Sequence, residues 1–214
     1  MRLFHFTSQE YGLLALEKRR LKIARINELN DPFEFLGRNL RDRCVRAKLK
    51  DWKRQRDEEL GILCLSGKWS NPLLWGHYAD KHHGMAIGFD VPECGTYRQV
   101  KYCRKRLPVP SDSELEEGDL DDLLLTKFNA WRYESEYRRF CHLADGIRES
   151  DLYFEPFSNM LKLAQVIVGE RSTISRRTLD EVLGPEYAHV EKFKARPAFG
   201  DFSVVRNRND RLWT

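Results

Sequence analysis

The chain has 214 residues, of which 41% are hydrophobic and 12% aromatic, a composition typical of a folded globular domain rather than a disordered chain. No apolar run approaches the roughly 20 residues of a membrane-spanning helix, and the first residues lack the long apolar core of a signal peptide. The net charge is +4, and five widely spaced cysteines form no CxxC motif, so we expect a cytoplasmic protein with reduced thiols.

The N-terminal half predicts strands and helices in irregular alternation. Thr7, with Glu10 three residues later, forms a capping-box pattern and predicts a helix to about Lys18. Pro72 predicts the first turn of a helix that ends at Gly84. Apolar residues at helical spacing predict another helix within residues 38–60. The strands expected in this half cover residues 2–6, 21–26, 61–66, 85–89 and 97–103.

The C-terminal half continues the same alternation. A helix is expected over residues 123–130, followed by a strand that carries Glu134 and Glu136. The remaining expected elements are a short helix after Pro156, a strand over 164–168, a helix over 173–183 and strands over 189–194 and 201–205. Neither repeats nor a long linker interrupt the pattern. The sequence therefore predicts a single α+β domain, residues 1–214, with a mixed or antiparallel β-sheet core and flanking helices.

Charge is distributed unevenly along the chain. Residues 38–56 contain nine Lys or Arg against two Asp, whereas residues 112–122 contain seven acids and no base. We expect a basic helical insertion near 38–60 and an acidic loop near 110–122. The basic stretch could bind nucleic acid, could be a solvated helix face, or could pair with the acidic segment. The residues expected to contact nucleic acid are Arg38, Arg41, Arg46, Lys53 and Arg56.

Common cofactor and nucleophile motifs are absent from the sequence. It contains no GxGxxG, GxxxxGK[ST] or GxSxG, which argues against a Rossmann dehydrogenase, a P-loop NTPase and an α/β-hydrolase. His82 and His83 lie five and six positions after His77, a spacing that turns them away from its helix face. We therefore expect no metal site there.

Glu134 and Glu136 form the most informative pair in the chain. If residues 131–140 are one extended strand, both carboxylates and Arg138 point to the same face. Two such carboxylates repel each other unless a cation, a substrate hydroxyl or solvent compensates them. The pair suits an enzyme that stabilises positive charge developing on a sugar carbon. The alternative is an edge strand with a charged face.

Three further candidates precede this pair. His5 lies on the first expected strand, Ser66 ends the strand over 61–66, and Tyr78 lies one turn into the following helix. Taken singly, each has a commoner structural explanation: a buried hydrogen-bonding histidine, a turn serine and a core aromatic. Taken in order with the late Glu-x-Glu, they form a constellation.

Nearly the full length resembles a family of bacterial proteins associated with phage resistance, a likeness that supplies no activity by itself. The motifs that carry it are Leu3-Phe4-His5-Phe6-Thr7, Asn30-Asp31-Pro32-Phe33-Glu34, Leu65-Ser66, Trp75-Gly76-His77-Tyr78-Ala79, His83-Gly84, Lys127 with Trp131, and Tyr133-Glu134-Ser135-Glu136-Tyr137-Arg138.

The order of the candidates also resembles, more weakly, the ADP-ribosyltransferase superfamily. That resemblance implies an ADP-ribosyltransferase-like fold in which His5, with Thr7 beside it, holds the ribose of NAD. It places Ser66 and Tyr78 around the nicotinamide, makes Glu136 the catalytic carboxylate and lets Glu134 orient the acceptor. Ser66 is followed by Gly67-Lys68 rather than by the Thr-Ser pair of the superfamily, and the sequence contains no glycine-rich NAD loop.

The expected function is an NAD-consuming transferase that acts as an effector of a bacterial toxin or phage-defence system. NAD is then a substrate, a nucleic acid or a protein is the acceptor, and an antitoxin is a possible partner. Two alternatives remain open: a nucleic-acid-binding defence module without NAD chemistry, and a nuclease in which Asp31, Glu34, Glu134 and Glu136 gather Mg²⁺. The first reading requires His5, Ser66, Tyr78 and Glu136 to line one pocket.

Overall fold

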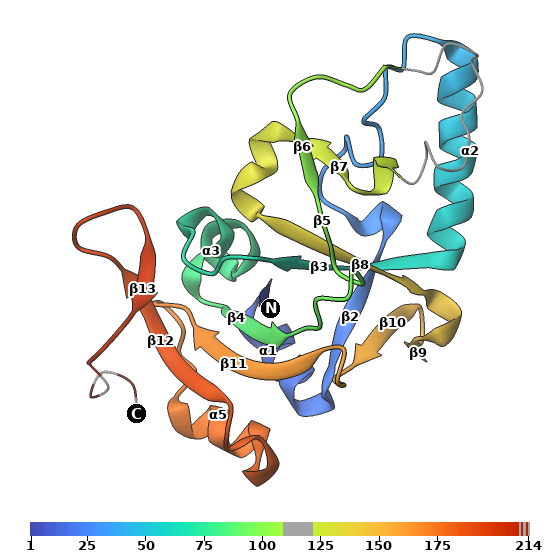
Figure 1. Ribbon diagram of the computed structural model, residues 1–214. Coiled ribbons are helices and arrows are strands. Elements are labelled where there is room, and N and C mark those ends of the chain that lie inside the picture. The colour runs from blue at the N-terminus through green and yellow to red at the C-terminus, as the bar shows by residue number, and fades with distance from the viewer. Residues whose placement is uncertain (109–121, 210, 212, 214) are drawn as a thin grey trace.

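An eleven-stranded sheet runs through the computed structural model, which describes residues 1–108, 122–209, 211 and 213 (Figure 1). Its strands are β1 (Arg2–Thr7), β2 (Arg20–Arg25), β3 (Leu60–Ser66), β4 (Met85–Asp90), β5 (Arg98–Gln99), β8 (Glu136–His142), β9 (Ile147–Glu149), β10 (Leu152–Pro156), β11 (Lys162–Val168), β12 (Glu191–Pro197) and β13 (Val204–Arg206). The main order is β13-β12-β11-β4-β1-β3-β2-β10-β9, and β8 pairs with both β3 and β5. Of these pairs, β11 with β12 is parallel and the others are antiparallel. The domain is thus α+β with a mainly antiparallel sheet.

The helices that lie wholly within the described residues are short, apart from one. They are α1 (Gln9–Lys18), α2 (Arg43–Glu59), α3 (Pro72–Tyr78) and α5 (Arg176–Leu183), with 3₁₀ turns η1 (Ile26–Glu28), η2 (Asp80–His82), η3 (Asn129–Glu134), η4 (Leu143–Asp145) and η5 (Pro185–Tyr187). A two-stranded parallel pair, β6 (Lys101–Cys103) with β7 (Thr126–Phe128), lies beside the main sheet (Figure 1). No described helix has the length and apolar content needed to cross a membrane.

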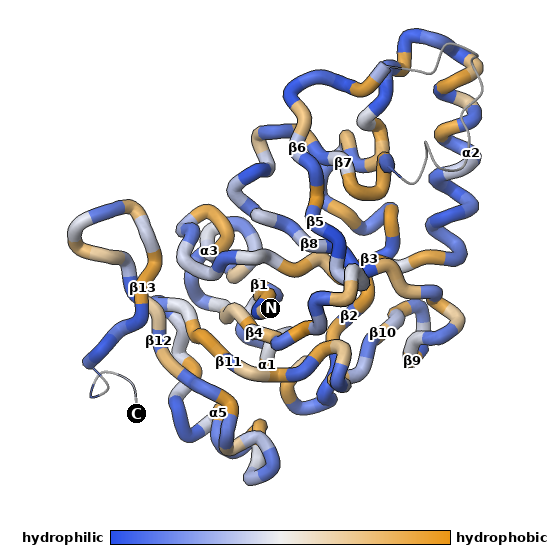
Figure 2. The backbone as a smooth tube through the Cα atoms, in the orientation of Figure 1, coloured by the Kyte–Doolittle hydropathy of each residue, from blue (hydrophilic) through white to orange (hydrophobic). Residues whose placement is uncertain are grey.

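The core lies around β4, which is flanked by β1 and β11. Five of the six residues of β4 are buried, as a strand covered on both faces requires, and the hydropathy colouring shows apolar residues along β4 and β11 (Figure 2). Trp75 of α3 is fully buried and meets Phe6 of β1 edge to face, with ring centroids 5.3 Å apart. This contact fixes α3 against the end of β1.

The basic stretch forms α2, which stands at one end of the molecule (Figure 1). Val45, Leu49 and Trp52 make its buried stripe, at the helical spacing that the sequence predicts. Asp42 caps the helix by accepting hydrogen bonds from the backbone N–H of Cys44 and Val45. The expected helical insertion near 38–60 therefore corresponds to an amphipathic helix that begins at Arg43.

A gap in strand pairing positions the candidate site. Along one edge, β3 pairs with β8 over its whole length. Along the other edge, β3 pairs with β2 at Gly61 and Ile62 and with β1 only at Ser66. Between these points β1 and β2 splay apart, so the middle of β3 borders an opening instead of a neighbouring strand.

Several expected elements were wrong in the N-terminal half. The α1 cap is Ser8, whose hydroxyl accepts from Tyr11 N, while Thr7 remains the last residue of β1 and pairs with Met85. Helix α3 ends at Tyr78 rather than near Gly84, because Asp80, Lys81 and His82 all have positive φ. The strand expected over 97–103 is divided into β5 and β6.

The larger corrections concern the C-terminal half. Residues 122–124 are helical, but residue 125 is a turn and residues 126–128 form β7, so a helix over 123–130 is wrong. The short helix expected directly after Pro156 is wrong, because residues 158–161, between β10 and β11, form a tight turn closed by backbone hydrogen bonds between Ser158 and Leu161. The hairpin of β9 and β10 was not expected. The acidic loop near 110–122 lies outside the described residues, except for residue 122.

Candidate active site

A pocket of about 340 Å³ occupies the opening between β1, β2 and β3. Its volume lies at the lower end of the range of small-molecule sites. Phe4, Phe6, Leu29 and Leu74 contribute apolar surface. The polar lining consists of His5, Lys22, Glu28, Asn30, Glu34, Cys64, Ser66, Tyr78, Lys127, Glu134 and Glu136. We call this site the carboxylate pocket.

Lys127 lies at the centre of the polar lining and contacts three carboxylates. Its Nζ is 2.6 Å from Glu134 Oε2, 3.1 Å from Glu136 Oε2 and 3.3 Å from Glu34 Oε1. Only 4% of its side chain is exposed. Burial alone would lower the pKa of Lys127, but the three carboxylates outweigh it and raise the pKa above its ordinary value. The lysine is therefore a permanent cation.

Arg138 is the second buried cation, and none of its side chain is exposed. Its Nε donates to Glu136 Oε1 at 2.7 Å, and its Nη2 donates to Glu34 Oε1 at 2.6 Å. Nη1 donates to the carbonyl of Leu124 at 2.7 Å, which connects the cluster to the segment before β7. These charge-assisted bonds fix the guanidinium in one orientation.

Glu136 is held by both cations. Burial would raise its pKa, but Arg138 and Lys127 together lower the pKa to about 2. The Cys64 thiol also hydrogen-bonds to this carboxylate, and burial together with Glu136 raises the pKa of Cys64. Glu136 is thus a fully ionised group whose oxygens are engaged by neighbours, and Cys64 stays a thiol.

Glu134 has a different environment. Its Oε2 faces Lys127, while its Oε1 accepts a hydrogen bond from the hydroxyl of Tyr78. Burial raises the pKa of Glu134, only partly offset by Lys127. Burial and the neighbouring Glu134 also raise the pKa of Tyr78, so the phenol keeps its proton. Asn30 Nδ2 donates to the same phenol oxygen at 2.9 Å, completing a short chain from the pocket rim to Glu134.

His5 lies where the pairing of β1 with β3 stops. Burial lowers the pKa of His5, and a hydrogen bond to the backbone of Cys64 opposes that change. This bond replaces the strand pairing that β3 lacks at the same point. A neutral ring that donates through one nitrogen keeps a lone pair on the other, which can accept from a ligand hydroxyl.

Ser66 and Thr7 have mainly structural contacts. The hydroxyl of Ser66 is 2.6 Å from the carbonyl of Glu134 and accepts from the backbone N–H of Lys68 at 3.1 Å. It therefore ties the end of β3 to η3. Thr7 does not line the carboxylate pocket.

The structure brings together His5, Ser66, Tyr78, Glu134 and Glu136, as the constellation requires. The expected reason was partly wrong. Glu134 ends the 3₁₀ turn η3 and Ser135 has φ 47°, so only Glu136 and Arg138 share one face of a strand. A turn instead of a strand places the first carboxylate.

The sequence did not assign three residues of this pocket to the NAD site: Lys127, Glu34 and Asn30. All three belong to the motifs shared with the phage-resistance-associated family. The Glu134 and Glu136 pair could have indicated that a cation lies beside it. Two carboxylates that face each other in a protein interior require a compensating positive charge. The sequence could not show which of its 37 Lys and Arg residues supplies it.

The five residues expected to contact nucleic acid do not share one exposed surface. Arg38 is buried and donates to the carbonyl of Pro108, and both Arg38 and Arg41 precede α2. Arg46 donates to backbone carbonyls of residues 40 and 41. Lys53 lies 5.9 Å from the centroid of the Phe35 ring, and Arg56 pairs with Glu59. The last three lie on α2.

The described residues contain no group of three or more His, Cys, Asp or Glu arranged to hold a metal ion. His77 hydrogen-bonds to Tyr133, while His82 stacks on Trp75. Three of the four acids of the alternative nuclease site already contact cations. Lys127 contacts all three, and Arg138 contacts two of them; these acids are Glu34, Glu134 and Glu136. Cations thus compensate the carboxylates that would have to bind Mg²⁺.

Comparison with known proteins yields no match: no family model, curated protein or solved structure corresponds to this chain.

Proposed function

We propose that the carboxylate pocket cleaves the nicotinamide–ribose bond of NAD, as part of an ADP-ribosyltransferase-like effector in a bacterial toxin or phage-defence system. The observation that supports this proposal is the convergence of His5, Tyr78 and Glu134 on one pocket from β1, α3 and η3. A histidine for ribose hydroxyls, an aromatic side chain and a carboxylate are the groups that such a reaction needs.

The charges of the pocket suit the chemistry. Departure of nicotinamide leaves positive charge on the ribose carbon, and a nearby carboxylate stabilises that charge. Three carboxylates surround two cations, so with all groups ionised the cluster carries one net negative charge. The excess negative charge would stabilise an oxocarbenium-like state.

Within this proposal, the contacts favour Glu134 over Glu136 as the carboxylate that reaches the ribose. Glu136 is bound by Arg138 through two nitrogens and also by Lys127. Glu134 has Lys127 as its single ionic contact among the described residues, and a neutral phenol holds its other oxygen. We therefore assign Glu136 to fixing the cations and Glu134 to the reacting carbon, the reverse of the expected assignment.

The test is nicotinamide release from NAD by the purified full chain. Glu134→Gln keeps the shape of the side chain but removes its charge, so we expect turnover to fall about 100- to 1,000-fold, the usual cost of one well-placed electrostatic group. Tyr78→Phe should reduce turnover by about 10-fold, because Glu134 then loses its orienting hydrogen bond.

Glu58→Gln is the matched control, since it makes the same chemical change on an exposed position of α2. Circular dichroism and thermal melting should show that Glu134→Gln remains folded. A folded wild-type protein that releases no nicotinamide contradicts the proposal. A Glu134→Gln variant with wild-type turnover contradicts the assignment of this carboxylate.

A further inference from the structure

A second hollow lies next to the carboxylate pocket, and Lys127 lines both. It has a volume of about 250 Å³. Phe33, between η1 and α2, and Phe128, at the end of β7, both border it. Arg104, Lys105 and Arg106 form its rim, and a neighbouring hollow joins Lys105 and Arg106 to Arg41. We call this surface the aromatic–basic groove; it consists of Phe33, Arg41, Arg104, Lys105, Arg106 and Phe128.

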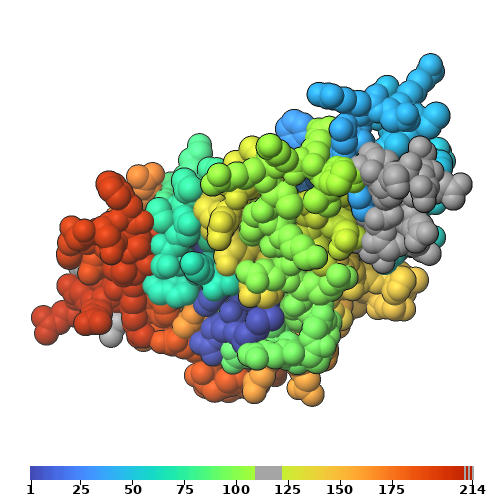
Figure 3. Space-filling view, turned by 45° about the horizontal axis from the view of Figure 1, so that its top comes forward, coloured from blue at the N-terminus to red at the C-terminus, as the bar shows by residue number. Residues whose placement is uncertain are grey.

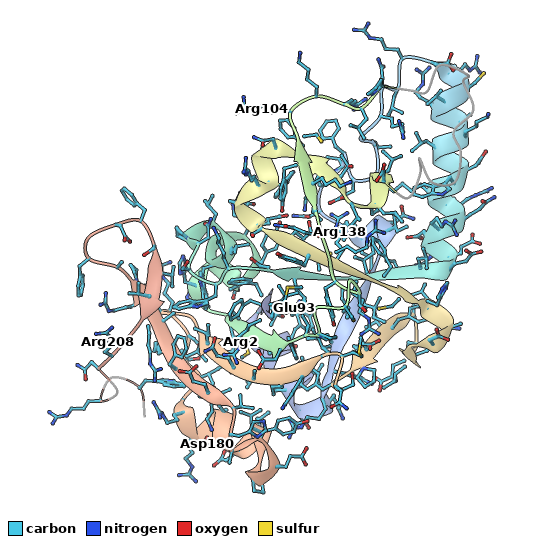
Figure 4. All side chains as sticks on the ribbon, in the orientation of Figure 1. Arg2, Glu93, Arg104, Arg138, Asp180 and Arg208 are labelled. Atoms are coloured by element: carbon cyan, nitrogen blue, oxygen red, sulfur yellow. The ribbon has the colours of Figure 1, made fainter. Side chains whose placement is uncertain are left out.

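The cations of the groove have no acidic partner within the part of the chain that the structure describes. Residues 104–106 are all exposed, and Arg104 projects from the outer surface of the molecule (Figure 4). No Asp or Glu among the described residues lines either hollow or forms an ion pair with these three residues. Arg41 likewise forms no ion pair with a described carboxylate, and four adjacent cations of this kind attract a polyanion.

The two phenylalanines point to a ligand with flat rings. Phe33 is 57% exposed and Phe128 is 52% exposed, so about half of each side chain is open to solvent. Both border the same hollow although they are 95 residues apart in the sequence. Arg106 lies 5.7 Å from the centroid of the Phe33 ring, so charge and ring face occur side by side. Aromatic faces between cations are the usual platform for stacked nucleobases.

The walls of the groove are fixed by backbone hydrogen bonds. The N–H of Asn39 donates to Leu107 O at 2.9 Å, and the N–H of Leu107 donates to Gly37 O at 2.7 Å. The Arg38 guanidinium donates to Pro108 O at 2.7 Å, and β6 pairs with β7 beneath the rim. In the space-filling view, the green segment that includes β6 lies beside the yellow segment that follows residue 125 (Figure 3). A pre-formed groove loses less free energy on ordering when it binds.

We propose that the aromatic–basic groove binds single-stranded nucleic acid, with phosphates on the cations and one base against Phe33 and Phe128. A single strand is favoured over a duplex because base faces are accessible for stacking only when the bases are unpaired. The hollow of about 250 Å³ has room for one base rather than for a folded domain. This proposal does not depend on NAD cleavage.

The test measures fluorescence anisotropy of labelled 15-nucleotide U and dT oligomers with the full chain, without NAD, between 50 and 200 mM salt. Binding of either oligomer supports the proposal. The ratio of the two affinities shows whether the groove prefers RNA or DNA. The combined Arg104→Ala, Lys105→Ala and Arg106→Ala variant should weaken binding and reduce the salt slope by about 2, since each lost phosphate contact removes about 0.7.

Phe33→Ala and Phe128→Ala should each weaken binding about 10-fold with little change in the salt slope, because stacking is not ionic. Two matched controls lie elsewhere: Phe199→Ala removes a phenylalanine that is 94% exposed, and the combined Lys48→Ala, Lys50→Ala and Arg54→Ala variant removes three exposed charges from α2.

Three results would overturn the proposal. One is no binding of either oligomer at 50 mM salt. Another is equal weakening by the groove variants and by their matched controls. The third is equally tight binding of a 15-base-pair duplex or of polyglutamate, which would show a surface that attracts any polyanion.

Discussion

Lys127 lines both the carboxylate pocket and the aromatic–basic groove, but the charges of the two sites differ in burial and in pairing. In the pocket, three carboxylates and two cations are buried and bonded to one another. In the groove, four cations face solvent without a described carboxylate beside them. Figure 4 shows the contrast in two labelled residues, because Arg138 lies in the interior and Arg104 at the periphery.

The difference follows from the cost of taking ions out of water. A buried ion is tolerated only when other charges and hydrogen bonds replace its hydration, so the pocket must be fully assembled before any ligand arrives. An exposed cation keeps its hydration and remains available to an incoming anion. The pocket is therefore built to hold fixed charges in place, and the groove to attract a charged partner.

The largest expected effect concerns Arg138. Arg138→Met leaves Glu34 and Glu136 without their main partner, so we expect the free energy of unfolding to fall by about 3–5 kcal/mol, the usual cost of removing one member of a buried ion pair. The matched control is Arg139→Met, which removes the next residue on the opposite face of β8, where the pair with Glu155 is partly exposed. Urea denaturation measures both. Equal losses of stability in the two variants would show that the buried cluster contributes no more than the partly exposed pair.

Acid should reveal the same cluster. The folded pKa of Glu136 is about 2 against an ordinary value of 4.5, so its stabilising contribution is complete above pH 4.5 and is lost as pH falls toward 2. This displacement corresponds to roughly 3 kcal/mol. The raised pKa of Glu134 acts in the opposite direction above pH 4.5. In thermal melts from pH 5 to pH 2, Glu136→Gln should flatten the profile relative to Glu58→Gln; a parallel profile contradicts this origin.

Ser66 provides an intermediate test. Ser66→Ala removes the hydroxyl that is 2.6 Å from the Glu134 carbonyl and leaves a buried acceptor without that partner, which costs about 1–3 kcal/mol. Because this hydroxyl is bonded to backbone, we expect KM for NAD to change less than stability. Paired melting and kinetic measurements separate the two. A raised KM with unchanged stability would restore Ser66 as a ligand-binding residue.

The smallest effect on stability is expected in the groove. Arg104→Ala and Lys105→Ala remove exposed charges without described ionic partners, so the free energy of unfolding should change by no more than about 0.5 kcal/mol each. Urea denaturation of the two variants beside wild type measures this. A loss of unfolding free energy comparable to that of Ser66→Ala would mean that these cations stabilise the fold, which contradicts this prediction.

Much of the local structure could be predicted from the sequence. The stripe of Val45, Leu49 and Trp52 predicted α2, and Pro72 after Asn71 predicted the start of α3, because both signals depend on residues within about two turns of each other. The segment before β8 could not be predicted in this way. There the hydrogen bond from the Ser66 hydroxyl to the Glu134 carbonyl and the buried Lys127 override the strand pattern of residues 131–135.

The sequence by itself determined an α+β domain, its basic helix and an ordered set of candidate residues that runs from His5 to Glu136. Only the tertiary structure decided that Lys127 and Arg138 compensate three carboxylates, that Arg38 is buried, and that Phe33 and Phe128 border one groove. The physical reason is distance along the chain. Periodicity and capping act over a few residues, whereas ion pairing and pocket formation join segments that only the folded sheet brings together.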